Sequence, residues 1–526
     1  MRLAWFTPLA PIRSGIASYS GMVLPALAGR HEIALFVDDA VWREHRGAAS
    51  AGADGFLAAT SPFGTVRSAH DFAPMHRARP FDLVVYQLGN AACHDYMWAY
   101  LARYPGLVVL HDAQLHQSRA KALLGRGRTA DLRAEFAFDH PDAPAGVADW
   151  ILQGLANPGA PIWPFTGVPL ASARVVAVHF AGLATDLRDE WPGLAVEVVR
   201  HGSPDLLASA ADDDRRAGGD KDQGPRTKGQ GSPNAQRPTP TQRGVSGQVR
   251  TEPADSGSGR AWELGLGSAL ALGPWPLELD HRARPVTFAA FGLVTPEKRI
   301  PQMLRALGAI RAVAPGIRLR LVGEVAPYYD LEADLHAHGV TDLVTVAGWV
   351  DDAAFDREIL AADVCLCLRW PTNREASGPW IRALAAGKPT VVNDLAHLVD
   401  LPTLDPRTWE VQVASAAAAD ANRTWRRDEA VAVAIDILDE DHSLAIAMRR
   451  LALDATLRVE LGTAARRHWA AQHTVAHMAA DYERAIAAAI ATPPPTRPLP
   501  AYVTEDHTGL ARRLAAEVGV AVDFLS

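Results

Sequence analysis

Short apolar runs alternate with helical patterns along the first 203 residues of the chain. The pattern predicts strands at residues 3–6, 32–37, 82–86, 106–110, 174–178 and 196–200, and a helix at 16–28. Strands that alternate with helices indicate parallel βαβ units with right-handed crossovers. We therefore expect residues 1–203 to form a Rossmann-like domain around a parallel sheet that is covered on both faces.

A second alternation of the same kind begins near residue 285. An apolar run spans 286–292, further strands are expected at 318–322, 344–346, 364–368 and 390–392, and helices at 302–313, 329–338, 352–362 and 379–386. In the last part of the chain, the pattern predicts helices at 429–437, 457–472 and 474–490. Residues 285–473 should form a second Rossmann-like domain. A helix at 474–492 should then cross back to the first domain, and residues 493–526 should form an accessory tail. Ligands of such α/β sheets bind at the carboxyl ends of the strands, here in a cleft between the domains.

The segment 204–284 separates the two alternations and has a different composition. Residues 209–261 contain almost no aliphatic or aromatic side chains, so they cannot bury enough apolar surface to offset the entropy of ordering. We interpret the segment as a disordered insertion between the domains, and the pattern of 263–284 is ambiguous. The run Asp212-Asp213-Asp214 is read as part of this solvated tract rather than as a metal site, which would need a rigid frame.

Length, charge and cysteine content narrow the function classes. A chain of 526 residues exceeds what one core usually organises, which agrees with two domains. The formal net charge of −8 argues against a nucleic-acid partner, which needs a basic surface. Three cysteines make no disulfide framework, and Cys365 and Cys367 fit a buried strand better than a metal or redox pair.

Targeting and membrane signals are weak. No stretch approaches the ~20 apolar residues of a membrane span. The start, Met1–Phe6, reads as a first strand and not as a signal peptide, so we expect a cytoplasmic protein. Peripheral membrane contact stays open, although no strongly basic amphipathic stretch supports it.

The strongest cluster of chemistry-bearing residues is the segment 369–380, which follows a predicted buried strand and opens a helix. Ser377 and Gly378 at the helix start can offer free backbone N–H groups and the positive end of the helix dipole to an anion. Glu375 places an acid just before them. The alternative is that Glu375 and Ser377 merely cap the helix, and the pattern alone favours neither reading.

Three further segments follow predicted strands in the same way. Gly292, Lys298 and Arg299 lie where the strand 286–292 turns into a helix, and the two cations could meet phosphate there or simply be solvated. Gly15 allows a tight turn after the first strand, without a dinucleotide fingerprint or a P-loop. His111 ends the strand 106–110, where a side chain can point toward the cleft, although a lone histidine is more often structural.

Taken in order, these segments resemble family 4 glycosyltransferases, which are group 1 glycosyltransferase-like enzymes of the GT-B fold that retain anomeric configuration. The resemblance covers most of residues 1–490. It rests on Ser14–Tyr19, Leu110–Asp112, Gly292 with Lys298, Gly323–Glu324, Ala347–Val350, Glu375–Gly378 and Ala386–Pro389.

The resemblance implies roles for individual residues. Lys298 would bind the donor diphosphate, His111 and Glu375 would contact the donor sugar, and Trp349 would flank the base. Gly15, Gly292, Arg299, Ser377 and Gly378 would lie beside the sugar or the phosphates.

Two positions depart from the family pattern. The second glutamate of the paired motif, which usually holds the ribose, is absent, and Arg382 or Ala383 stands nearest its place. Leu293 stands where an arginine is usual, so the diphosphate would depend on Lys298, with help from Arg299 or Arg369. Arg382 should pair with a carboxylate or a phosphate, because a buried charge needs a partner.

The resemblance therefore implies a retaining glycosyltransferase that moves a sugar from a nucleotide diphosphate sugar to an unidentified acceptor. We expect no cofactor and no metal, since Asp439-Glu440-Asp441 reads as an exposed acidic loop between helices rather than as a metal-binding motif. Three alternatives stay open. They are a non-catalytic sugar-nucleotide-binding or scaffold protein, another GT-B enzyme such as an epimerase or a phosphorylase, and an interaction module organised by the insertion.

Overall fold

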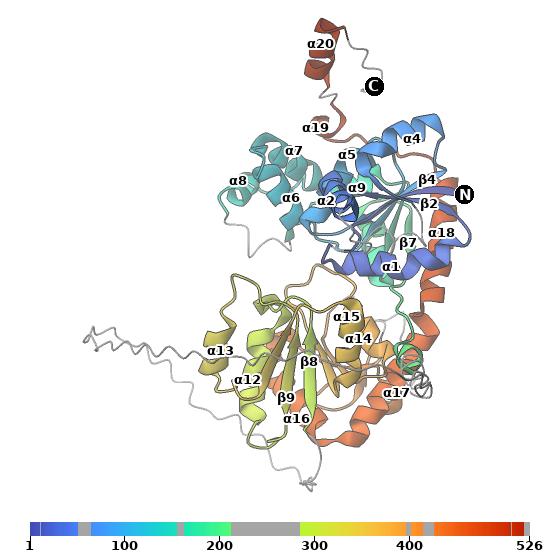
Figure 1. The fold of residues 1–526 in the computed structure, drawn as a ribbon. Helices are drawn as coiled ribbons and strands as arrows, with labels where there is room; N and C mark the ends of the chain where they lie inside the picture. Colours follow the sequence, from blue (N-terminus) through green and yellow to red (C-terminus); the bar gives the residue numbers. More distant parts are fainter. Residues whose placement is uncertain are drawn as a thin grey trace, which may run out of the picture. The chain divides into compact units, whose positions relative to one another are not determined.

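The computed structural model describes residues 1–10, 12–50, 65–154, 162–211, 285–395, 401–413, 426–505 and 508–519. The greater part of the predicted insertion, from residue 212 to 284, lies outside these residues. The segments 1–209 and 279–526 belong to one compact unit, which contains two parallel sheets (Figure 1). The predicted α/β architecture of two parallel-sheet domains is confirmed.

The first sheet has seven strands, all parallel, in the order β3-β2-β1-β4-β5-β6-β7. Because apolar side chains on successive residues point to opposite faces, the fully apolar strands bury both faces of the sheet. The short β3 was not predicted. The strands are β1 (Arg2–Phe6), β2 (Glu32–Val37), β3 (Thr65–Ser68), β4 (Leu83–Leu88), β5 (Leu107–Leu110), β6 (Val175–Val178) and β7 (Val196–Val198).

Helices of the first domain cover this sheet and extend beyond it. Between β5 and β6 the described residues form four short helices, α6 to α9, of which α6 to α8 share a small apolar core around Phe136 and Phe165. The helices are α1 (Gly15–Ala28), α2 (Asp39–Ser50), α4 (Phe72–Ala78), α5 (Trp98–Leu101), α6 (His116–Leu124), α7 (Thr129–Asp139), α8 (Val147–Leu152), α9 (Gly167–Ser172) and α10 (Ala181–Glu190).

The second sheet has eight strands in the order β10-β9-β8-β11-β12-β15-β13-β14, and only the pair β13–β14 is antiparallel. The strands are β8 (Thr287–Phe291), β9 (Arg318–Val322), β10 (Val344–Gly348), β11 (Val364–Cys367), β12 (Thr390–Asn393), β13 (Thr403–Leu404), β14 (Val411–Gln412) and β15 (Ala432–Ile435).

One predicted helix is wrong. Residues 429–437 contain the buried strand β15 (Ala432–Ile435), which pairs with β12 and β13. All four residues of β15 are buried. A short, wholly apolar run has no periodicity that would separate a strand from a buried helix, and the sheet partners decide the outcome.

Helices pack on both faces of the second sheet and continue to the end of the chain. They are α12 (Ile300–Ile310), α13 (Leu331–Ala337), α14 (Asp352–Ala361), α15 (Gly378–Ala385), α16 (Glu440–Leu453), α17 (Ala455–Gln472), α18 (Val475–Ala491), α19 (Ala501–Thr504) and α20 (Gly509–Glu517).

Helix α18 packs against the first sheet domain, in contact with α1 and with strands β4 to β7. Met478, Tyr482, Ile486 and Ala489 recur every three or four residues and form a buried stripe in the same core as Trp5. The last long helix is therefore an element of the first domain in space, although it follows the second domain in sequence (Figure 1).

Each sheet has a point near its middle where the strand order reverses direction along the chain. In the first sheet it lies between β1 and β4, and in the second between β8 and β11. The loops that leave two such strands turn to opposite faces of the sheet and leave a crevice, where α/β proteins bind ligands.

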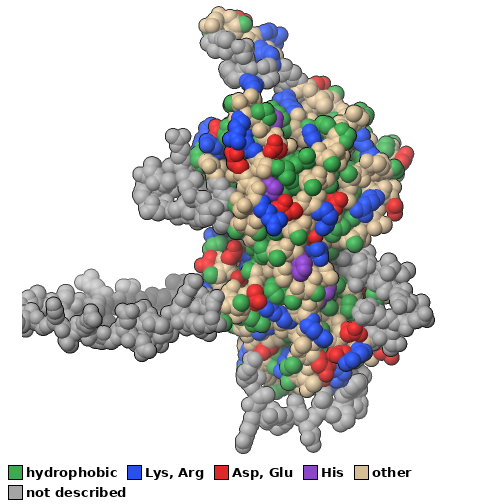
Figure 2. All heavy atoms as spheres, turned by 90° about the vertical axis from the view of Figure 1, so that its right-hand side faces the viewer, with side chains coloured by type: hydrophobic (Ala, Val, Ile, Leu, Met, Phe, Trp, Pro, Cys, Tyr) green, Lys and Arg blue, Asp and Glu red, His purple; other side chains and the backbone are tan. Residues whose placement is uncertain are grey.

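On the face that Figure 2 shows, basic and acidic side chains are interspersed rather than gathered by sign. Among the described helices, none is both long enough and apolar enough to cross a bilayer.

Candidate functional site

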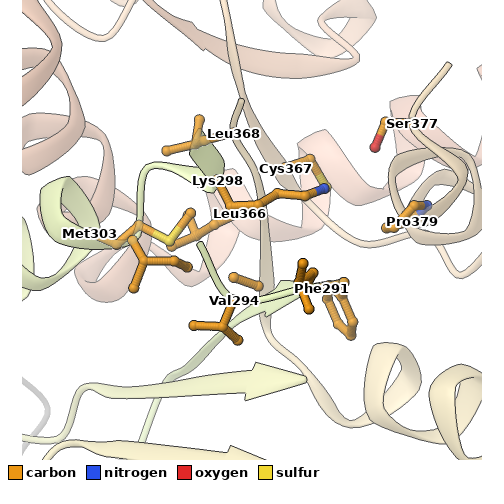
Figure 3. Close-up of a pocket in the computed structure, with 13 residues that line it drawn as sticks. Phe291, Val294, Lys298, Met303, Leu366, Cys367, Leu368, Ser377 and Pro379 are labelled. Atoms are coloured by element: carbon orange, nitrogen blue, oxygen red, sulfur yellow. The ribbon is translucent and has the colours of Figure 1, made fainter. Parts of the chain in front are cut away.

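A pocket lies at the switch point of the second sheet, as Figure 3 shows. Its walls are the carboxyl ends of β8 and β11, together with the loop after β8 and the start of α15. Polar groups reach it from Lys298, Cys367 and Ser377, while Leu293 and Met303 supply apolar surface.

Lys298 extends across this pocket, with its amine beside Cys367 in Figure 3. A short 3₁₀ turn, Pro296–Lys298, positions it, and the Thr295 hydroxyl caps that turn by accepting the Lys298 backbone N–H at 3.3 Å. Burial, followed by the repulsion of the Arg369 guanidinium, lowers the pKa of Lys298 to about 8. No carboxylate of the described residues lies within ion-pair distance of its ammonium, so the charge remains available to an anionic ligand.

Glu375 is held rigidly at the edge of the same site. Its Oε2 accepts the Asn373 backbone N–H at 2.8 Å and the Thr372 hydroxyl at 3.1 Å, and its Oε1 lies 2.6 Å from Arg369 Nε. Burial alone would raise the pKa of Glu375, but Arg369, the local backbone and Lys298 outweigh it and lower that pKa. The side chain is therefore a carboxylate near neutral pH, and its partners fix its position.

Ser377 caps α15, because its hydroxyl accepts the Trp380 backbone N–H at 3.3 Å. The capping role that the sequence left open is thus present, and the hydroxyl still lines the pocket. Gly378 is the first residue of the helix, and Pro379, which has no N–H, follows it.

Arg299 does not line the pocket. It has φ of 61°, and its Nε donates to both carboxylate oxygens of Glu440 at 2.8 and 2.9 Å. Glu440 is the first residue of α16 and only 6% exposed. The prediction that Asp439-Glu440-Asp441 forms an exposed acidic loop is therefore wrong at Glu440, because this carboxylate neutralises a cation that the strand-to-helix turn places beside it. The diphosphate role expected for Arg299 has no support in this geometry.

Arg382 is buried in α15 and paired with two carboxylates of α14. Its Nη1 lies 2.9 Å from Asp356 and its Nη2 lies 3.1 Å from Asp352, and its guanidinium also lies over the Phe355 ring. The expected charge partners are thus carboxylates of this chain. Ala383, the other residue near the place of the missing glutamate, is fully buried.

The loop that precedes α1 contacts the second sheet domain. The guanidinium of Arg13 pairs with Glu324 and lies 4.5 Å from the ring centre of Trp349, which is half exposed. Ser18 donates to the carboxylate of Asp352 at 3.0 Å. Gly15 begins α1 after the Ser14 cap, and no atom lies within 4 Å of where a Cβ would stand, so a side chain there would enter open space.

Three histidines end three neighbouring strands of the first sheet. His111 follows β5, His179 follows β6, and His201 lies shortly after β7. All three rings pack on Tyr19, at centroid distances of 4.6, 5.4 and 5.0 Å. Each imidazole is nearly buried, with 5 to 7% of the residue exposed.

Hydrogen bonds fix the tautomers of two of these histidines. His179 Nδ1 must donate to the Val199 carbonyl at 2.8 Å, so its Nε2 accepts from His111 Nδ1 at 3.0 Å. His111 Nε2 then lies 2.8 Å from Gln87 Oε1, so this unprotonated nitrogen is satisfied when the Gln87 amide is turned to present its NH₂ group at that position. Burial lowers the pKa of His111 well below its usual value and that of His179 to about 4, so both rings are neutral. With both ring nitrogens engaged, His111 has no free donor for the sugar contact that the resemblance implies.

Asp112 joins the two sheet domains beside Glu375. Its Oδ2 accepts the Asn90 backbone N–H at 2.7 Å, and the next residue, Ala113, donates its N–H to the Asn373 carbonyl at 2.8 Å. Burial raises the pKa of Asp112 to about 6, and the Asn90 hydrogen bond opposes this. The loop that carries His111 therefore touches the loop that holds Glu375.

The sequence analysis missed His179 and His201, although a signal was present. The rule that selected His111, a histidine directly after an apolar strand, applies equally to His179 after Val175–Val178. Within the described ranges, no group of three His, Cys, Asp or Glu side chains is arranged to hold a metal ion.

Comparisons with known proteins give one family match and several similar folds. Residues 285–421 match the family model "Glycosyl transferases group 1". No curated protein matches the chain significantly.

Two solved structures share the fold of nearly the whole chain. The crystal structure of Anabaena Alr3699/HepE in complex with UDP is 12% identical, with a TM-score of 0.50, and the match covers 92% of this chain and 99% of that one. A glycosyltransferase from Rickettsia africae ESF-5 is 10% identical, with a TM-score of 0.50 and coverage of 93% and 98%. The chain therefore has the two-sheet GT-B fold, and its second sheet domain carries the signature of group 1 glycosyltransferases.

Proposed function

We propose that this protein is a glycosyltransferase that moves a sugar from a nucleotide diphosphate sugar to an acceptor, with retention of anomeric configuration. The observation that carries the proposal is the Lys298 amine in the switch-point pocket, with the Arg369–Glu375 ion pair near enough to act on its pKa. It lies in the domain that matches group 1 glycosyltransferases. The similar fold of Alr3699/HepE, which was crystallised with UDP, supports a nucleotide as part of the donor.

The charges of the site suit the charges that such a reaction develops. Transfer of the sugar leaves negative charge on the diphosphate, and Lys298 can stabilise it together with the Gly378 backbone N–H at the start of α15. The sugar gains positive oxocarbenium character, which a fixed carboxylate at Glu375 would favour. Because the cation and the carboxylate are already in place, little reorganisation is needed during the reaction.

Retention follows here from front-face attack by the acceptor, without a protein nucleophile. Glu375 is saturated by its hydrogen bonds and by Arg369, so it is better suited to stabilise charge than to attack carbon. We also propose that the reaction needs no metal, with Lys298 and the Gly378 backbone N–H taking the diphosphate charge.

Nucleotide release tests the proposal. The purified protein is incubated with UDP-, GDP-, ADP- and dTDP-sugars, with cell extract as the acceptor source, in parallel with Glu375→Gln and the control Glu358→Gln. Glu358 also pairs with an arginine, Arg320, but away from the pocket. We expect release from one donor, a loss of about 100-fold in Glu375→Gln, and no change in the control or in excess chelator. Equal release by all three proteins would refute the role of Glu375, and dependence on added manganese would refute the metal-free mechanism.

A second candidate is a non-catalytic protein that binds a sugar nucleotide. Arg382 favours it, since this cation with its Asp352 and Asp356 partners stands beside the place of the absent glutamate. This reading predicts tight binding of one nucleotide sugar, with no product after prolonged incubation with extract. Stoichiometric binding without turnover would support this non-catalytic candidate over the transferase.

A further inference from the structure

Two aromatic side chains stand exposed at the carboxyl edge of the second sheet. Tyr328, in the loop after β9, is 68% exposed, and Trp370, in the loop after β11, is 40% exposed. Within the described residues no ring or cation stacks on either of them, whereas the guanidinium of Arg13 lies over the ring of Trp349. Open aromatic surface contributed by two neighbouring loops is typical of a place where a ligand binds.

A single glutamate connects these two residues to the pocket. The backbone N–H of Trp370 donates to the Glu297 carbonyl at 2.8 Å, and the Tyr328 hydroxyl donates to Glu297 Oε2 at 3.3 Å. The other oxygen of this carboxylate, Oε1, has no hydrogen bond or ion pair among the described residues. Glu297 belongs to the same 3₁₀ turn as Lys298, whose amine lies in the pocket. Two aromatic residues and a free carboxylate oxygen therefore lie beside one another, next to the pocket.

Backbone hydrogen bonds hold the loop of Tyr328 in place. Val294 N donates to the Glu324 carbonyl at 2.8 Å, and Ala326 N donates back to the Val294 carbonyl at 3.0 Å, so the loops after β8 and β9 are joined. Tyr329 N donates to the Ala326 carbonyl at 3.0 Å and closes the turn that carries Tyr328. Because the backbone is fixed before a ligand arrives, binding at this surface costs little ordering entropy.

The same surface adjoins the ion pair of the proposed active site. Burial and then Glu297 raise the pKa of Tyr328, while the nearby Arg369 guanidinium opposes this, so the phenol keeps its proton and donates it. The same guanidinium lies 2.6 Å from the Glu375 carboxylate. A molecule seated on Tyr328 would therefore lie close to the groups that are proposed to face the donor.

These groups match the surface of a sugar better than that of a nucleotide. One face of a pyranose ring carries C–H groups, which are attracted to the electron-rich face of an aromatic ring, and its hydroxyls can donate to a carboxylate. The negative charge of Glu297 repels the phosphates of a nucleotide and leaves a neutral sugar unaffected.

We propose that Tyr328 and Trp370 form an aromatic platform for a neutral pyranose ring of a carbohydrate acceptor, and that Glu297 accepts hydrogen bonds from the hydroxyls of that ring. This inference rests on the proposed function, since it gives the acceptor of the same site a chemical class. The three residues act in binding and orientation of the acceptor and have no part in binding the nucleotide.

The test measures sugar and nucleotide binding separately in the full chain. Neutral trisaccharides of glucose, galactose, mannose and N-acetylglucosamine are titrated by saturation-transfer NMR, and UDP, GDP, ADP and dTDP by calorimetry. We expect Tyr328→Ala and Trp370→Ala to weaken binding of the preferred trisaccharide about 10-fold, and Tyr328→Phe, which keeps the ring, to stay within about 3-fold. Nucleotide affinity should not change in any of them. Trp150→Ala, which removes an exposed tryptophan of α8, is the control.

The outcomes separate this inference from the proposed function. Wild-type protein that binds a nucleotide but none of the four trisaccharides would overturn the aromatic platform and leave the proposed function standing. Trisaccharide binding that the alanine variants lose, without nucleotide binding by any of the proteins, would refute the proposed function and keep the platform. If the alanine variants keep their trisaccharide affinity, or lose nucleotide affinity as well with unchanged thermal midpoints, the two aromatics are not an acceptor platform.

Discussion

The carboxyl edges of the two sheets are built from opposite kinds of side chain. The second sheet presents charge, in Lys298 of the pocket and in the nearby ion pair of Arg369 and Glu375. The first sheet presents His111 and His179, which are neutral, closed by mutual hydrogen bonds and packed on a tyrosine. The comparison teaches that the second sheet domain is suited to bind an ionic group, whereas the histidine row of the first is rigid and uncharged, with Asp112 as the acidic residue beside it.

Burial explains why the side chains are charged at the edge of the second sheet and why the imidazoles are neutral at the edge of the first. Ionised groups keep their charge only where partners or solvent offset the loss of hydration, and the second sheet provides both. Imidazoles that are sealed inside the first sheet domain lose their charge, and their neutral tautomers then interlock. Charge at the second edge and neutrality at the first follow from the same cost of desolvation.

The largest effect is expected at the ion pair that supports the charged edge. Glu440→Ala leaves the Arg299 guanidinium without its carboxylate in a largely buried place, and should lower the free energy of unfolding by about 3 kcal/mol. Chemical denaturation followed by tryptophan fluorescence measures this.

The adjacent Asp441→Ala is the matched control. Asp441 pairs with Arg305, but both side chains are exposed, so its loss should cost about 0.5 kcal/mol. Equal destabilisation by the two variants would show that burial does not distinguish these pairs.

A somewhat smaller effect is expected at the ammonium group of the pocket. Lys298→Met should lower the rate of nucleotide release about 100-fold, because a preorganised cation facing the diphosphate is lost. In the wild type, the pKa of about 8 means that Lys298 is charged below pH 8 and neutral above it. Affinity for the nucleotide diphosphate should therefore fall as the pH rises through 8, and titrations from pH 6.5 to 9.5 measure this.

Arg311→Met serves as a control for charge alone, since Arg311 is an exposed cation of the same domain. It should keep both the rate and the pH profile. A Lys298→Met protein that still loses affinity above pH 8 would assign the titration to another group.

The smallest effect is expected in the neutral row. His179→Leu leaves the Val199 carbonyl and His111 Nδ1 without a partner, which should cost about 2 kcal/mol at pH 7. The wild-type His179 has its pKa lowered to about 4, so the unfolded chain binds a proton more readily and acid destabilises the fold. The leucine variant lacks this penalty. The difference in the free energy of unfolding between the wild type and the variant should therefore be smaller at pH 5 than at pH 7, by roughly 1 to 2 kcal/mol.

Thermal unfolding at pH 7 and pH 5 measures both numbers. His336→Leu, on the exposed surface of α13, should change neither. If the stability difference between the wild type and His179→Leu were instead larger at pH 5 than at pH 7, His179 would be charged in the folded protein.

The elements with regular patterns were predictable. The strands at 32–37 and 318–322 agree with the structure residue for residue, since apolar runs flanked by turns leave few alternatives. Lys298 and Ser377 line one pocket because both follow parallel strands of the same sheet, while the roles expected for them stay predictions. What each side chain binds did not follow, because Glu440 and Arg299 are far apart in sequence.

The features that the sequence did not predict share one physical cause, which is their dependence on tertiary contacts. The strand at 432–435 and the helices between β5 and β6 depend on tertiary partners that local periodicity does not encode. The tautomers of His111 and His179 depend on a carbonyl from the neighbouring strand. Such properties emerge only once the sheet order is known.

Helix α18 has a practical consequence for anyone who divides this protein. Its stripe from Met478 to Ala489 completes the core of the first sheet domain, so an N-terminal fragment that stops before the second domain would expose Trp5 and its neighbours to water. A chimera that exchanges the second sheet domain should therefore carry residues 475–491 together with the N-terminal half. For the same reason, α18 would have to stay with the first sheet domain if the two domains were inherited separately.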